Sequence, residues 1–178
     1  MKSLLELARQ TIEAYFEDEE IEIPEILKKK YSQKQACFVT LMKNGQLRGC
    51  IGTLYPRKAL WEDIQENSLN AAFNDTRFYP LKKEEFEKIK IEISILSIPE
   101  KLEFENPDDL LKKINNKMGI ILRKGNYYAT YLPQVWEQIS KKEEFLESLS
   151  MKAGLKKNTW MDKDVEIYIY TAKKIKER

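Results

Sequence analysis

The residues most able to do chemistry lie in the run Leu-Arg-Gly-Cys-Ile-Gly-Thr, residues 47–53. Arg48 and Cys50 are two positions apart in an expected strand, so both side chains should lie on one face. A guanidinium beside a thiol favours the thiolate, and Gly49 and Gly52 would let a ligand or another backbone come close. This pattern indicates a reactive thiol or an anion-binding patch. The alternative is structural, with Cys50 as a small buried residue and Arg48 as a paired surface charge.

Polar residues at expected strand ends and in loops give further candidates. Asp75 and Arg77 precede Phe-Tyr-Pro in a loop, where they could form an acid/base or salt-bridge pair. Thr53 ends the run just described, and Thr130 and Gln134 could supply a hydroxyl and an amide to a ligand. We take Arg48, Cys50 and Asp75 as candidate catalytic residues. The candidate binding residues are Thr53, Arg77, Thr130 and Gln134. The structural alternatives are a turn cap with a local ion pair, and a strand end followed by a helix that starts at proline.

The absence of histidine narrows the chemistry sharply, since none of the 178 residues is a histidine. Ser-His-Asp and Cys-His catalysis are thereby excluded within this chain, as are metal sites that need His ligands. The two cysteines, Cys37 and Cys50, are too few for a structural zinc or an iron–sulfur cluster. We therefore expect no metal and no cofactor held by this chain, and acid/base groups drawn from Asp, Glu, Lys, Tyr or Cys.

Composition points to a globular protein of one domain, or of two small lobes that share a core. Hydrophobic residues make up 42% of the chain, and 31 Lys and Arg nearly balance 29 Asp and Glu. That balance argues against a nucleic-acid module, and we expect no DNA partner. No run approaches the length of a membrane span, and the first ten residues lack the apolar core of a signal peptide. We therefore expect a cytoplasmic protein with reduced thiols.

Asn44-Gly45 predicts a tight hairpin between strands at 36–43 and 46–54, because a type I′ turn needs positive φ at both positions. A two-residue loop would place Leu41 opposite Arg48 and Val39 opposite Cys50. Cys37 and Cys50 would then share a face, in diagonal positions unsuited to a disulfide. The other face, with Phe38, Thr40, Met42, Leu47 and Ile51, is expected to pack on the core.

The remaining pattern favours an α+β fold with antiparallel sheets and flanking helices. Ser3 and Glu6 form an expected capping box, and Asn106-Pro107 starts a later helix. Alternating isoleucines predict a strand at 89–95, and a second hairpin surrounds residues 124–126. Tyr127, Tyr128 and Tyr131 in that hairpin could stack on bases, but strand tyrosines more often lie on a sheet surface. Gly154 should end a helix that carries Phe145 and Leu149.

The run at 47–53 resembles the signature of the AMMECR-domain family. Five further motifs occur in the family's order: Phe-Val-Thr-Leu at 38–41 before the signature, Asp-Thr-Arg-Phe at 75–78, a strand at 91–97, a Leu-Pro-Gln-Val segment within 129–135, and a late run from Phe145 to Leu155. Thr76 and Trp136 are small departures from the pattern. The resemblance covers nearly the whole chain and implies one AMMECR domain over 1–178, in two unequal lobes, with the signature near the cleft between them.

The resemblance to protein A of the AmmeMemoRadiSam system implies two partners, a Memo-like protein and a radical S-adenosylmethionine protein. We expect a substrate-binding or adaptor component of that system. The first alternative is a thiol- or acid/base-dependent enzyme that acts on a small metabolite or an RNA base, as in RNA modification. The second alternative is an RNA-binding module. The missing histidine weighs against an autonomous enzyme, since histidine is the commonest general base.

Overall fold

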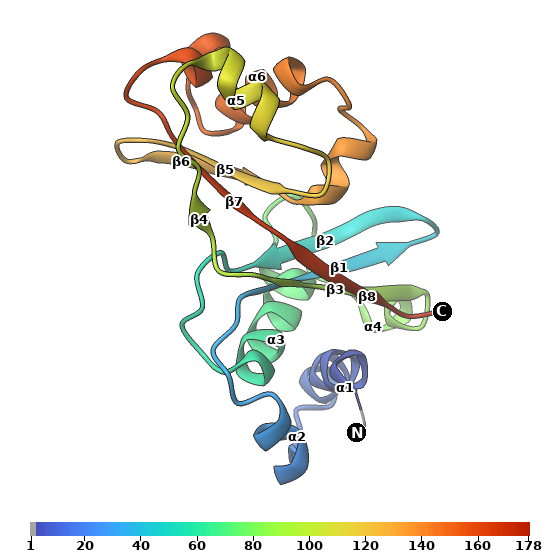
Figure 1. Ribbon diagram of the computed structural model, residues 1–178. Helices are drawn as coiled ribbons and strands as arrows, with labels where there is room; N and C mark the ends of the chain where they lie inside the picture. Colours follow the sequence, from blue (N-terminus) through green and yellow to red (C-terminus); the bar gives the residue numbers. More distant parts are fainter. Residues whose placement is uncertain (1–2) are drawn as a thin grey trace. The chain divides into compact units, whose positions relative to one another are not determined.

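The computed structural model describes residues 3–178, and Figure 1 shows its helices and strands. The chain forms two compact units. We call the first the N-terminal unit: it runs to Ile98 and also contains Lys173–Arg178. The second, here the C-terminal unit, comprises Pro99–Ala172. Each unit has a four-stranded sheet with its own helices, which confirms the predicted α+β class and the unequal lobes.

The N-terminal unit is built on a sheet with the strand order β2-β1-β3-β8. Its strands are β1 (Cys37–Lys43), β2 (Gln46–Gly52), β3 (Ile89–Leu96) and β8 (Ala172–Lys176). Its helices are α1 (Leu4–Glu17), α2 (Glu25–Lys30), α3 (Leu60–Leu69), a π-helical turn (Asn70–Asn74) and α4 (Lys83–Phe86). The capping box at Ser3 and Glu6 is present, so the predicted start of α1 is confirmed.

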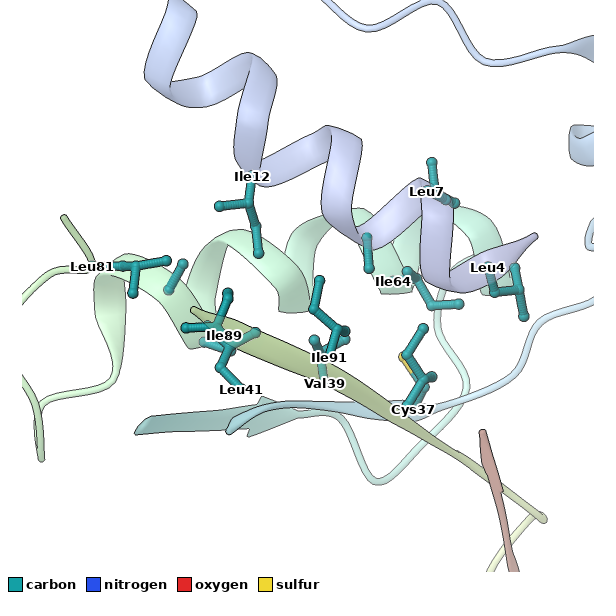
Figure 2. Close-up of a cluster of buried hydrophobic side chains, with 14 of the residues drawn as sticks. Leu4, Leu7, Ile12, Cys37, Val39, Leu41, Ile64, Leu81, Ile89 and Ile91 are labelled. Carbon is teal, nitrogen blue, oxygen red and sulfur yellow. The ribbon is translucent and has the colours of Figure 1, made fainter. Parts of the chain in front are cut away.

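Figure 2 shows the core of the N-terminal unit, where apolar side chains of β1 and β3 meet those of α1 and α3. Cys37, Val39 and Leu41 are fully buried there, and Ile51 packs against the same cluster. This corrects the sequence-based expectation, which put the core on the face of Phe38 and Met42. Both of those side chains are only half-buried.

The buried face of β1 is the one that contacts α1 and α3, and a β-bulge in the first hairpin decides which side chains of β2 lie on that face. The turn is as predicted, with φ of 52° at Asn44 and 78° at Gly45. Met42 pairs with Leu47, but Leu41 pairs with Gly49, so Arg48 is the extra residue. Beyond such a bulge every side chain of β2 changes face relative to β1. Cys50 therefore pairs with Thr40 rather than Val39, and the prediction that it shares a face with Cys37 is wrong.

The C-terminal unit has a sheet with the order β4-β7-β5-β6. Its strands are β4 (Glu100–Lys101), β5 (Gly119–Lys124), β6 (Tyr127–Tyr131) and β7 (Glu166–Tyr170). Its helices are α5 (Pro107–Lys113), α6 (Lys142–Lys152) and two 3-10 turns (Pro133–Glu137 and Lys157–Met161). Trp136 stacks on Phe145 at 3.7 Å between ring centroids in its core. The predicted Asn106 cap and the left-handed Gly154 after α6 are both confirmed.

One strand was missed. The alternation of Val165, Ile167 and Ile169 predicted a single last strand, and β7 corresponds to it. After Thr171 the chain continues as β8, which belongs to the sheet of the N-terminal unit. None of the helices within residues 3–178 is both long enough and apolar enough to cross a bilayer.

Candidate functional site

The glycines of the 47–53 run bring backbones into close contact. A Cβ at Gly49 would lie 2.1 Å from the carbonyl oxygen of Ala71, in the π-helical turn that follows α3. A Cβ at Gly52 would lie 2.4 Å from the carbonyl oxygen of Cys37. Side-chain carbons are not found at such distances from backbone oxygens. Both glycines therefore allow β2 to pack against its neighbours, and they do not leave room for a ligand.

Asp75 joins the loop after the π-helical turn to β2. Its buried carboxylate accepts hydrogen bonds from the Cys50 backbone N–H at 2.8 Å and from the Arg77 backbone N–H at 3.2 Å. The Arg77 guanidinium adds bonds of 2.9 Å from Nε and 2.7 Å from Nη2. These bonds, above all those from Arg77, lower the pKa of Asp75 to about 2. Both carboxylate oxygens are thus occupied by structural donors.

Arg48, the bulge residue, is held by α4 and by the loop before it. Its Nε and Nη2 donate to Glu85 at 3.3 and 2.9 Å, and Nη2 also donates to the Tyr79 carbonyl at 3.0 Å. Lys43 shares the same carboxylate at 2.6 Å. Arg48 and then Lys43 lower the pKa of Glu85 to about 2. Nη1 of Arg48 is buried and has no hydrogen-bond partner among residues 3–178.

A pocket lies beside this ion-pair cluster, within the N-terminal unit. Its lining residues come from β1, β2, the loop after Asp75 and α4: Lys43, Arg48, Arg77, Phe78, Tyr79, Pro80, Leu81, Lys82 and Glu85. We call it the basic pocket, because four of these side chains are cationic and only Glu85 is anionic. The guanidinium carbons of Arg48 and Arg77 lie 5.9 and 5.6 Å from the centroid of the Phe78 ring. The Tyr79 side chain is 88% exposed.

The two thiols have different surroundings. Cys37 is fully buried, and burial together with the nearby Asp63 carboxylate raises the pKa of its thiol well above the usual range. Cys50 is half-buried, with its sulfur 3.1 Å from the Thr40 hydroxyl. Arg77 donates to the Cys50 carbonyl at 3.0 Å and interacts electrostatically with its thiol. The guanidinium close to Cys50 is therefore that of Arg77. The sequence-based expectation named Arg48, but that side chain is bound to Glu85.

These surroundings predict that native protein exposes one reactive thiol. Iodoacetamide at pH 8 should modify Cys50, whereas Cys37 should remain unmodified because burial disfavours its thiolate. Peptide mass analysis after labelling, with and without urea, measures both sites in one sample. Cys50→Ser provides the control and should leave no rapidly labelled thiol. Labelling of Cys37 in the folded protein would contradict this description.

Thr53 is engaged inside the N-terminal unit. Its hydroxyl donates to the two carboxylate oxygens of Asp63 at 3.0 and 2.8 Å. Asp63 is itself buried on α3 and also accepts from the Cys37 backbone N–H at 2.9 Å and the Asn67 amide at 3.1 Å. The threonine therefore helps to pin β2 to α3.

Thr130 and Gln134 belong to the C-terminal unit. The Thr130 hydroxyl donates to the Ile120 carbonyl at 2.9 Å and is 2.8 Å from the Tyr170 hydroxyl, whose pKa is raised by burial. Gln134 is half-buried in the 3-10 turn that follows β6. Arg48, Cys50, Asp75 and Arg77 thus form one connected group in the N-terminal unit. That these four residues line one cleft together with Thr53 and Gln134 stays a prediction.

Several residues of the basic pocket were not identified from the sequence. Tyr79 follows the Asp-x-Arg-Phe segment directly, so an exposed aromatic beside two arginines could have been noticed. Lys43, Lys82 and Glu85 carried no signal, because isolated charges are abundant in this chain. In the folded chain Glu85 pairs with both Lys43 and Arg48, and it thereby joins them to the signature.

Comparisons with known proteins extend the match over almost the full chain. The AMMECR1 family model matches residues 5–175. A protein from Aquifex aeolicus is 40% identical, with 100% of this chain and 93% of the relative covered. Protein NEQ441 from Nanoarchaeum equitans is 39% identical over 94% of this chain and 95% of its own length. The crystal structure of the uncharacterised protein PH0010 from Pyrococcus horikoshii superposes with a TM-score of 0.92 at 36% identity, covering 98% of this chain and 90% of PH0010. On this evidence the chain belongs to the AMMECR1 family.

Proposed function

We propose that this chain is a binding component, an adaptor or substrate-binding protein, that acts in the cytoplasm with a Memo-like protein and a radical S-adenosylmethionine protein. The observation that carries the proposal is the engagement of the chemistry-bearing side chains. Asp75 holds two backbone N–H groups and a guanidinium, and Arg48 holds Glu85 and a backbone carbonyl. A carboxylate and a guanidinium that make these hydrogen bonds hold a loop in position, and they are poorly placed to transfer protons.

Of the four connected candidate residues, Arg48 and Arg77 also line the basic pocket, which is open to solvent. Its exposed Tyr79 ring and its cations offer area and charge to a partner or to a substrate. Aromatic and arginine side chains are enriched where proteins bind one another. We further propose that cofactor chemistry is supplied by the radical protein, since this chain has no histidine and only two cysteines.

Co-purification of the chain with each proposed partner tests this function. We expect a complex with at least one of them by size exclusion and native mass spectrometry, and no turnover by the chain alone. Lys82→Glu should weaken the complex about ten-fold or more, because it reverses a charge on the pocket rim. The matched control is Lys83→Glu: the neighbouring lysine is also exposed but pairs with Glu17 and does not line the pocket.

Asp75→Lys is a poor choice for this experiment, because the buried carboxylate holds β2 and its loss would disturb the fold. If Lys82→Glu and the native chain bound the partner with equal affinity, the pocket would not be part of the interface. Failure to bind either partner would overturn the proposed function. Turnover by the isolated chain would overturn it in favour of a thiol- or acid/base-dependent enzyme.

A further inference from the structure

The basic pocket carries an excess of positive charge that its own carboxylates do not neutralise. Lys43 and Arg48 share the single carboxylate of Glu85. Arg77 is paired with Asp75, and Lys82 on the rim adds another charge. Four cations against these two carboxylates leave an excess of two positive charges. The pocket, of about 970 Å³, is large enough for a small organic molecule.

The donors in the pocket suit an oxyanion. Guanidinium groups present planar N–H donors that match the oxygens of carboxylates and phosphates. Arg48 keeps Nη1 without an acceptor in the described chain, and a buried donor without a partner is unfavourable. An oxyanion that reached Nη1 would satisfy this donor, while Nε and Nη2 stay bonded to Glu85. Lys82 lies in the same lining and can contribute a second cationic contact.

An aromatic surface lies beside these donors. Phe78 is in contact with both guanidinium groups, and the next residue, Tyr79, exposes 88% of its side chain. The Tyr79 backbone is fixed, because its carbonyl accepts from Arg48 at 3.0 Å. An exposed ring on a held backbone next to cations can stack on a planar ring of a ligand. The pocket thus combines an anion site with a stacking surface.

We infer that the basic pocket binds a small phosphate monoester that carries a planar aromatic ring. A phosphate monoester has a charge of about −1.5 to −2 at pH 7 and three acceptor oxygens, which match the excess charge and the donors. The ring would lie on Tyr79 while the phosphate faces Arg48 and Lys82. This inference deepens the proposed function, since it rests on the pocket being the binding site and names the ligand class.

Calorimetric titration of the full chain with four simple probes tests the ligand class. Phenyl phosphate should bind about ten-fold more tightly than glycerol phosphate, because only the former can stack on Tyr79. It should also bind more tightly than phenyl sulfate, which has the same ring but only one negative charge. Inorganic phosphate should bind in the same weak range as glycerol phosphate. Equal binding of all four probes, or no binding of phenyl phosphate, would overturn the inference.

Two variants assign the binding to this pocket. Tyr79→Ala should abolish the preference for phenyl phosphate over glycerol phosphate and leave the affinity for glycerol phosphate unchanged. Lys82→Gln should weaken both phosphates about five- to ten-fold, whereas Lys83→Gln should weaken neither. Tyr79, Lys82 and Lys83 are all exposed, so the melting temperature of each variant should stay near that of the native chain. Unchanged affinities in Tyr79→Ala and Lys82→Gln would show that phosphate binds elsewhere.

The outcomes for the ligand and for the proposed function can be separated. Partner binding is measured without any phosphate ester, and ester binding is measured without any partner. A partner complex with no affinity for phenyl phosphate refutes the ligand class alone. Phenyl phosphate binding without a partner complex refutes the adaptor role and leaves the ligand class standing.

Discussion

Replacing Gly49 with alanine should lower the free energy of unfolding by about 3 kcal/mol or more. The new Cβ would meet the Ala71 carbonyl oxygen at 2.1 Å, and that atom belongs to backbone that cannot rotate away. β2 and the π-helical turn would have to separate. The Asp75 bond to the Cys50 N–H lies next to this contact and should weaken with it. Urea denaturation at pH 7, followed by fluorescence of the three tryptophans, measures the loss.

Gly125→Ala is the matched control for this substitution. Gly125 has a φ of +58° in the second hairpin, with open space around its expected Cβ. Alanine there should cost only about 1 kcal/mol, from the left-handed backbone conformation. If Gly49→Ala were no more destabilising than Gly125→Ala, the close packing of β2 on the π-helical turn would be wrong.

Asp75→Asn should be the second most damaging change, with a loss of about 2 kcal/mol at pH 7. The amide cannot accept both backbone N–H bonds and the guanidinium bonds, and it places N–H donors against other donors. The exposed Glu20→Gln removes a carboxylate charge from a loop and should change the stability by less than about 0.5 kcal/mol. Urea titrations of the three proteins side by side give the comparison.

The effect of Asp75→Asn should depend on pH. The pKa of Asp75 is about 2 in the folded chain and about 3.9 in an unfolded one. A carboxylate with a lowered folded-state pKa stabilises the protein above the unfolded value, and this contribution is lost as the pH falls through the folded value. The gap between native chain and variant should therefore be constant from pH 5 to 7 and shrink from pH 4 toward 2. A gap that stays constant down to pH 2 would contradict the role of the charge.

The amino-acid sequence by itself determined the features that depend on neighbouring residues. The Asn44-Gly45 turn, the capping box at Ser3, the Asn106 cap and the glycine after α6 all follow from local backbone conformation and hydrogen bonding. Alternation of isoleucines placed β3, and the mixture of hairpins and helices gave the α+β class. The ordered motifs gave the family, because they extend over nearly the whole chain.

The tertiary structure alone decided which face of the hairpin is buried and what Arg48 contacts. A strand repeats every two residues, so one bulged residue exchanges the faces beyond it, and no local signal marks a bulge at Arg48. Asp75 and Cys50 are 25 positions apart, and Arg48 and Glu85 are 37 apart, so these pairs meet only after folding. β8 has few apolar residues and forms a strand because β3 offers it a free edge. Long-range packing therefore buries Asp75, where it connects its loop to β2, and it places lysines, arginines and Tyr79 side by side in the basic pocket.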